Sequence, residues 1–161
     1  MRKILPFIFI LLFGSTVFVA LNYDGDARTF PEQLRDAMPF AEFDTYIDPQ
    51  YGYSVKYPSF FDKEEVDEKK GNVRFSYRDN TNLVLEAEVK PKDFLHDKNA
   101  LETIDSGSVE RLDGYEFIRH CVRHEDHWYV LTFYFPANCK QGVERIVYQV
   151  KTWKPFLKKR F

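Results

Sequence analysis

The sequence is poor in the residues that build common catalytic and ligand-binding motifs. It has only two cysteines and seven glycines in 161 residues. The glycines are scattered, and none precedes a Lys-Ser or Lys-Thr pair at the spacing of a phosphate-binding loop. There is no Gly-x-Ser-x-Gly nucleophile motif either. The net charge of −2 offers no concentrated basic face, so the sequence argues against nucleic-acid binding.

The two cysteines, Cys121 and Cys139, are expected to be unpaired. Cys121 falls near the tip of a predicted hairpin and Cys139 falls beyond the far end of its second strand. Their Cα atoms should therefore lie farther apart than the roughly 7 Å that a disulfide tolerates. His120 precedes Cys121, but neighbours along a strand point to opposite faces and do not form a catalytic dyad. A cysteine in such a position is more often a small core residue than a nucleophile. A hydrolase that uses Cys121 is an alternative, but no catalytic motif in the sequence supports it.

The N-terminus has the pattern of an export segment. Arg2 and Lys3 precede an apolar run from Ile4 to Leu21, and Asp24 follows it. Positive residues before such a run keep the N-terminus inside and send the rest of the chain outward. The bulky Phe18 is unfavourable for cleavage after the apolar run, and about 18 residues suffice to span a bilayer. A cleaved signal peptide and a retained membrane anchor therefore both remain open.

These signals divide the chain into three parts. Residues 1–22 are the signal peptide or anchor, residues 23–28 are a polar linker, and residues 29–161 are predicted to form one extracytoplasmic domain of the cell envelope. The composition, 44% hydrophobic and 17% aromatic, is that of a folded domain with a core rich in rings.

The patterns along residues 29–161 predict an α+β fold. Alternating apolar and polar residues indicate strands, and apolar residues at three- and four-residue spacing indicate helices. The expected architecture is an antiparallel sheet of five to six strands with helices packed on it and a long C-terminal helix. A capping box of Thr29 and Glu32 should start the first helix. The expected elements are a helix to Met38, a strand at 51–58, a charged connector at 62–70, a hairpin of 73–77 and 83–89, a helix at 94–104, a hairpin of 114–123 and 128–135, and a helix at 143–157.

Two stretches of the sequence resemble PsbP-like domains. The first is Tyr51-Gly52-Tyr53-Ser54-Val55-Lys56-Tyr57-Pro58-Ser59-Phe60-Phe61, and the second is Trp128-Tyr129-Val130-Leu131-Thr132-Phe133-Tyr134-Phe135-Pro136 followed by a connector and a helix. The resemblance could cover residues 46–157 and implies an α/β/α sandwich. Members of that family mostly act as binding or assembly accessories, so the resemblance implies no catalytic residues.

One local cluster could bind a metal. If Glu125 and Asp126 form a two-residue hairpin loop, His124 and His127 face each other with Cβ atoms about 5 Å apart. His120 lies on the same face, two pairs away. These three imidazoles, with Asp126 or a water, could hold Zn²⁺, Cu²⁺ or Ni²⁺. Their spacing matches no established zinc motif, and an exposed polar hairpin tip explains them as well.

The sequence therefore favours a non-enzymatic binding or accessory protein of the cell envelope. Its partner would be a protein or a small ligand in the envelope, with membrane contact only through residues 1–22 if they are retained. No cofactor and no nucleic acid is expected. The alternatives are a metal-binding protein that uses the histidine hairpin and a hydrolase of unknown type.

Overall fold

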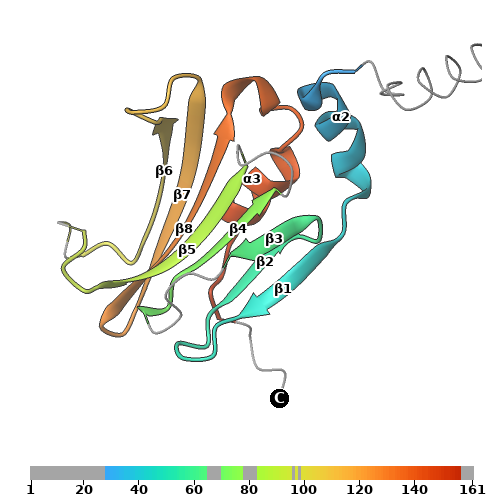
Figure 1. Ribbon diagram of the computed structural model, residues 1–161. Coiled ribbons are helices and arrows are strands. Elements are labelled where there is room, and N and C mark those ends of the chain that lie inside the picture. Colours follow the sequence, from blue (N-terminus) through green and yellow to red (C-terminus); the bar gives the residue numbers. More distant parts are fainter. Residues whose placement is uncertain (1–27, 65–69, 78–82, 96, 98, 157–161) are drawn as a thin grey trace, which may run out of the picture.

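The computed structural model describes residues 28–64, 70–77, 83–95, 97 and 99–156. Within them the chain is α+β and has two antiparallel sheets (Figure 1). The larger sheet has six strands in the order β3-β4-β5-β8-β7-β6, and the smaller pairs β1 with β2. The strands are β1 (Phe43–Ile47), β2 (Ser54–Pro58), β3 (Phe61–Glu64), β4 (Val73–Tyr77), β5 (Val84–Pro91), β6 (Glu102–Ser108), β7 (Tyr115–His124) and β8 (His127–Pro136); the helices are α2 (Phe30–Ala37), η1 (Met38–Phe40), η3 (Ala137–Cys139) and α3 (Glu144–Lys151).

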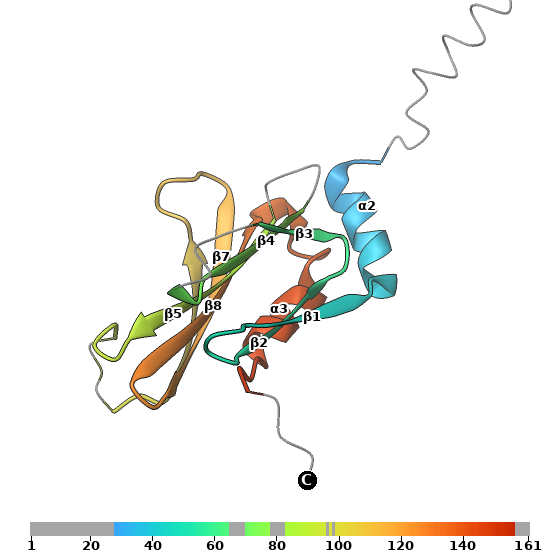
Figure 2. The same cartoon turned by 60° about the horizontal axis from the view of Figure 1, so that its bottom comes forward.

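Helix α3 and the β1–β2 hairpin lie on the same side of the six-stranded sheet. Figure 2 shows α3 next to β2, with both on the same side of β5, β8 and β7. Helix α3 packs on β7 and β8 and also contacts β2. Over β4 the same face is covered by the hairpin, since Tyr57 of β2 stacks on Phe75 of β4 at 4.1 Å between ring centroids. This face of the sheet carries the main hydrophobic core.

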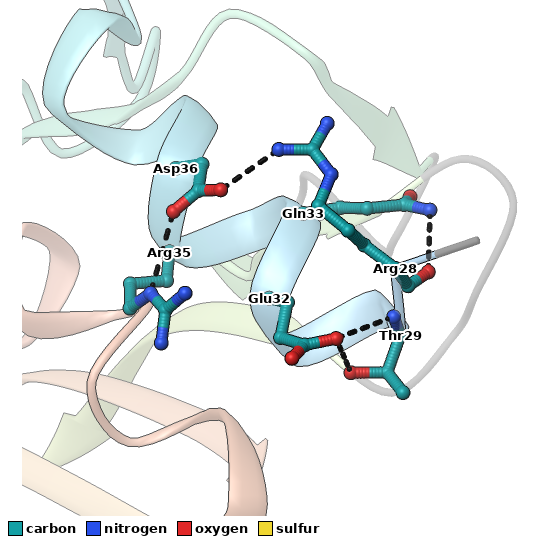
Figure 3. A network of polar contacts seen from close by, with 6 residues as sticks. All are labelled: Arg28, Thr29, Glu32, Gln33, Arg35 and Asp36. Atoms are coloured by element: carbon teal, nitrogen blue, oxygen red, sulfur yellow. Dashed lines mark hydrogen bonds and ion pairs between the residues drawn. The ribbon is translucent and has the colours of Figure 1, made fainter. Parts of the chain in front are cut away.

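Helix α2 begins with the predicted capping box, which is confirmed (Figure 3). The Glu32 carboxylate accepts hydrogen bonds of 2.8 Å from the backbone N–H and from the hydroxyl of Thr29. The backbone bond is the main reason why the pKa of Glu32 is lowered. Because a lowered folded-state pKa favours the ionised form, the cap stabilises the helix at neutral pH and weakens as the pH falls through that pKa.

The hairpin predicted around Glu125 and Asp126 is confirmed, and its loop has the two-residue length on which the pairing of His124 with His127 depends. His124 of β7 pairs with His127 of β8, which leaves Glu125 and Asp126 as the loop. Glu125 has a φ of 54°, a left-handed conformation that tight hairpin loops require and that glycine or asparagine adopts more easily. The long pairing of β7 with β8 therefore holds a loop for which Glu-Asp is a poor local choice.

The predicted helix at 94–104 is wrong. Residues Glu102–Ser108 form strand β6, which pairs with β7 at the edge of the large sheet. Before it, Leu95 and Ala100 pack on Trp128, on the sheet face opposite α3. Pairing with a long neighbouring strand outweighs a weak helix preference in this segment, because strand formation depends strongly on tertiary context.

The C-terminal helix is shorter than predicted. It was expected over 143–157, but α3 ends at Lys151 and Thr152 caps it. Pro155 explains the difference, since a residue that precedes proline is disfavoured in the α conformation. The chain beyond the helix instead packs on β2. The Pro155 carbonyl accepts a 2.6 Å hydrogen bond from the Ser54 N–H, and the Trp153 indole donates one of 2.7 Å to the Ser54 carbonyl.

Two strands were missed in the first half of the chain. Strand β1 was not predicted, although it pairs with β2 along its whole length. Strand β3 covers Phe61–Glu64 and thus the start of the expected charged connector at 62–70. Three of its four residues are charged, which hid the apolar alternation that usually marks a strand.

Gly71 and Gly52 have similar backbone conformations but differ in how closely other side chains approach them. Both have positive φ, 66° and 69°. A Cβ on Gly71 would lie 2.5 Å from Tyr51 Cδ2 and 2.8 Å from Val89 Cγ2, whereas one on Gly52 would meet nothing within 4 Å. We expect Gly52→Ala to cost about 1 kcal/mol from its backbone conformation and Gly71→Ala to cost about 1–3 kcal/mol more from overpacking. Urea unfolding checks this, and equal costs for the two variants would contradict the packing described here.

Candidate binding groove between helix α3 and strand β6

A groove of about 440 Å³ lies beside α3, on the sheet face that the helix only partly covers. The helix lines it with Glu144, Val147, Tyr148 and Lys151. These four positions are spaced i, i+3, i+4 and i+7, so they form one stripe of the helix. The stripe that enters the core is different and includes Ile146 and Val150. Helix α3 therefore has two functional faces, one packed on the sheet and one left for the groove.

The floor of the groove comes from the large sheet. Ser106 of β6 is opposite Ile118 of β7, and Glu116 of β7 is opposite Phe135 of β8. Residues directly opposite each other in a sheet share a face, so these four side chains point toward α3. All four line the groove. Ile118 and Phe135 are buried and give it an apolar base.

The rim of the groove is charged, and Tyr148 stands at its side. Lys140 Nζ lies 3.1 Å from Glu116 Oε2, an ion pair across one end. Glu144 and Lys151 place one charge of each sign along the helix side. The Tyr148 side chain is 63% exposed, although it is large and aromatic. An apolar base, an exposed tyrosine and a charged rim are the composition of a binding surface, in which aromatic residues are enriched and polar groups surround them.

His120 is buried and hydrogen-bonded at both ring nitrogens. Its Nδ1 lies 2.7 Å from the Val150 carbonyl oxygen of α3, and its Nε2 lies 2.7 Å from Glu102 Oε1 of β6. A carbonyl only accepts, so Nδ1 carries a hydrogen and donates it. His120 thus links β6, β7 and α3, and both of its nitrogens are engaged.

The other predicted metal ligands lie at the hairpin tip and turn to different neighbours. The His124 ring lies 4.5 Å from the Phe156 ring, and the His127 ring lies 5.5 Å from the Tyr51 ring. Asp126 forms an exposed ion pair with Lys92 at 2.8 Å, and the hydrogen bond from that lysine is the main reason why the pKa of Asp126 is lowered. Within the described part of the chain, no group of three His, Cys, Asp or Glu side chains is arranged to hold a metal ion.

Metal binding at the hairpin stays a prediction that a thermal melt can test. Any site there would have to be built by His124 and His127, because His120 is held elsewhere. Two imidazoles without a third protein ligand bind weakly, so we expect Zn²⁺, Cu²⁺ or Ni²⁺ to raise the Tm of the full-length chain by no more than about one degree. A shift of several degrees that a chelator reverses and that His124→Ala abolishes would establish the metal site instead.

Both cysteines are buried and free, as predicted. Burial raises the pKa of the Cys121 thiol, and a hydrogen bond with Thr103 opposes this only in part. Burial also raises the pKa of Cys139. A raised pKa keeps a thiol protonated and unreactive, so the surroundings of Cys121 do not favour a nucleophile.

Sequence reasoning did not find the groove. Val147 packs partly against the main core and also lines the groove, and Tyr148 was not singled out. The i, i+3, i+4, i+7 spacing of the stripe was present in the sequence. However, the groove also needs β6, and that segment was predicted to be helical. Only the pairing of β6 with β7 places Ser106 opposite the helix.

Comparison with known proteins gives one structural likeness. No family model and no curated protein sequence matches the chain. Among solved structures, the chain is similar to the solution structure of cyanobacterial PsbP (CyanoP) from Synechocystis sp. PCC 6803. The TM-score is 0.48 with 12% sequence identity, over 70% of this chain and 91% of that chain. The PsbP-like likeness concerns the fold alone, and no site is carried over from it. In the described residues, no helix is long and apolar enough to cross a membrane.

Proposed function

We propose that this chain is a non-enzymatic accessory protein of the cell envelope and that it binds a partner protein through the groove beside α3. The observation that carries the proposal is the exposed stripe of α3. Tyr148 is 63% exposed above an apolar floor, in a groove of about 440 Å³ with charges along its rim. A tyrosine is favoured at such a place because its ring is apolar and its hydroxyl remains hydrogen-bonded on the surface.

Two further observations support the proposal. The apolar run at residues 4–21 behind Arg2 and Lys3 favours export. The groove walls carry carboxylates, ammonium groups and one serine, but the two thiols of the chain are buried and protonated. The groups that line the groove are therefore sufficient for binding a partner.

Cysteine labelling tests location and binding in one experiment. Tyr148→Cys and Phe40→Cys each add an accessible thiol to the full-length chain, one in the groove and one on a side chain that is 87% exposed and outside it. Cys121 and Cys139 are 1% exposed and give little background. Spheroplasts of the native host are treated with a membrane-impermeant maleimide that carries a photoreactive group.

We expect labelling of both variants, because the domain faces outward, and a crosslinked protein from position 148 only. Labelling without any crosslink from position 148, or the same crosslinks from both positions, would contradict binding in the groove. Absence of labelling in intact spheroplasts, with labelling after lysis, would contradict export.

A further inference from the structure

Strand β6 presents an open hydrogen-bonding edge beside the groove. It is the last strand in the order of the large sheet. At its two ends, the Arg123 N–H donates to the Leu101 carbonyl at 2.8 Å and the Val109 N–H donates to the Tyr115 carbonyl at 2.9 Å. Both bonds join residues that lie opposite each other when the β6–β7 register, in which Thr103 is opposite Cys121, is continued beyond the strand ends. In an antiparallel pair, such hydrogen-bonded residues alternate with residues whose N–H and C=O point away. The backbone groups of Glu102, Ile104 and Ser106 therefore point away from β7.

The same alternation places the side chains of these three residues on the α3 face. Ser106 lines the groove, and the Glu102 carboxylate reaches His120. Ile104 lies between them and is 49% exposed. The open backbone edge and the groove meet at Ser106, which lines the groove, and the side chains of Glu102 and Ile104 lie on the same face of the sheet.

The two edges of the large sheet differ in how they are protected. Strand β3, at the other edge, has four residues and carries Asp62, Lys63 and Glu64. Short length and charged side chains, lysine above all, are how natural edge strands avoid further pairing. Strand β6 has seven residues with the sequence ETIDSGS, without lysine or proline, and pairs with β7 without a bulge. Its edge is therefore suited to accept another strand.

The charged residues of β6 indicate which kind of strand could pair with its open edge. Glu102 and Asp105 are the two charged residues of β6, and their side chains are 62% and 54% exposed. Glu102 faces the groove side, where it contacts His120, and Asp105 faces the opposite side, where its carboxylate lies 3.7 Å from Arg119 Nη1. A segment that pairs with β6 thus meets carboxylates along the edge and apolar surface at Ile104 and in the groove.

We propose that β6 accepts an extended segment of a partner protein as an added strand, in which apolar side chains alternate with polar and basic ones. This rests on the proposed function and specifies its binding mode. Residues of the added strand that exchange hydrogen bonds with Ile104 and Ser106 place their side chains on the groove face. These are the apolar residues, and one of them enters the groove next to Tyr148. The intervening residues lie on the other face, where lysine or arginine meets Asp105. Main-chain bonds supply affinity and the groove supplies specificity, as in other cases of strand addition.

Synthetic peptides test the binding mode directly. The probe is a fluorescently labelled peptide of about seven residues, matching the length of β6, in which leucine or valine alternates with lysine or threonine. Binding to the full-length chain in mild detergent is followed by fluorescence anisotropy, with detergent alone as the blank. One control peptide is N-methylated at a leucine, whose N–H faces β6, and another at a threonine, whose N–H faces away. We expect the first to bind at least about tenfold more weakly and the second to bind like the parent. A peptide with glutamate in place of lysine should also bind more weakly.

Ser106 provides the matched protein variants. Ser106→Pro removes an N–H that points outward and leaves the ladder to β7 intact, since proline is accepted at such positions of edge strands. Ser106→Ala removes only the hydroxyl. We expect Ser106→Pro to weaken peptide binding by about tenfold, and by clearly more than Ser106→Ala, which changes the side chain but keeps the outward N–H. Circular dichroism establishes that each variant is folded, and the N-methylated peptides decide the question if Ser106→Pro is not.

The possible outcomes separate this proposal from the proposed function. Equal effects of the two N-methylated peptides, or no peptide binding at all, would overturn strand addition. A crosslink from position 148 would in that case still support a partner in the groove. A dimer of the chain that Ser106→Pro disrupts would show that a second copy occupies the edge, and would overturn capture of a partner segment.

Discussion

Replacing Phe75 by alanine should lower the free energy of unfolding by about 3–5 kcal/mol, the usual cost of deleting a fully buried phenylalanine. Phe75 is 0% exposed and lies in the middle of β4. Its ring stacks on Tyr57 at 4.1 Å and meets Tyr46 edge-on at 5.8 Å between centroids. These two tyrosines come from β2 and β1, so Phe75 joins the small sheet to the large one.

The control for this prediction is Phe40→Ala. Phe40 is 87% exposed, and its removal should change stability by no more than about 0.5 kcal/mol. Urea unfolding followed by circular dichroism measures both variants. A cost below about 1 kcal/mol for Phe75→Ala would show that the hairpin is not packed on β4 as described. Since small domains are stabilised by only about 5–15 kcal/mol, the expected loss is a large part of the total.

The sequence predicted this core well where the strands alternate clearly. In β4, Val73 and Phe75 are buried and Arg74 lies between them with intermediate burial, as the period of two requires. The capping box of α2 and the position of the turn between β7 and β8, around Glu125 and Asp126, were also predicted correctly. In each case the signal is local, within three or four residues of the chain.

The elements that were predicted wrongly are set by distant contacts or by one neglected residue. Strand β6 exists because β7 pairs with it, and nothing in ETIDSGS alone favours a strand. Helix α3 ends early because of Pro155, which a purely periodic pattern overlooked. The groove needs both β6 and the short helix, so it could not be predicted from the sequence. The same holds for His120, whose two hydrogen-bond acceptors lie 18 and 30 residues away in the chain.

His120→Ala should cost about 2–5 kcal/mol of stability, because it removes a fully buried ring and the 2.7 Å hydrogen bond to the Val150 carbonyl, which keeps the 3.2 Å bond from the Trp153 N–H. Glu102→Gln should cost less than about 1 kcal/mol. The Glu102 side chain is 62% exposed, and water replaces the lost charge interaction there. The two partners of one 2.7 Å contact are thus expected to contribute very unequally. Similar losses in the two variants would contradict this.

Two amide substitutions separate the two hydrogen bonds of His120. The side-chain nitrogen of asparagine reaches about as far as Nδ1, and that of glutamine about as far as Nε2. His120→Asn thus keeps a donor toward Val150, whereas His120→Gln keeps one toward Glu102. We expect the asparagine variant to be the more stable, by about 1 kcal/mol, because the Val150 bond is buried and the Glu102 bond is open to water.

The comparison of these two variants also bears on the edge strand. In His120→Asn, Glu102 loses its link to β7, and amide hydrogen exchange should become faster along β6 while α3 keeps its protection. The opposite pattern, with a protected β6 and an exposed α3, would show that Glu102 rather than Val150 is the important partner. Because the Glu102 and Ser106 side chains lie on the same face of β6, a looser edge in His120→Asn should also weaken binding of the alternating peptide, even though no atom of His120 reaches the groove.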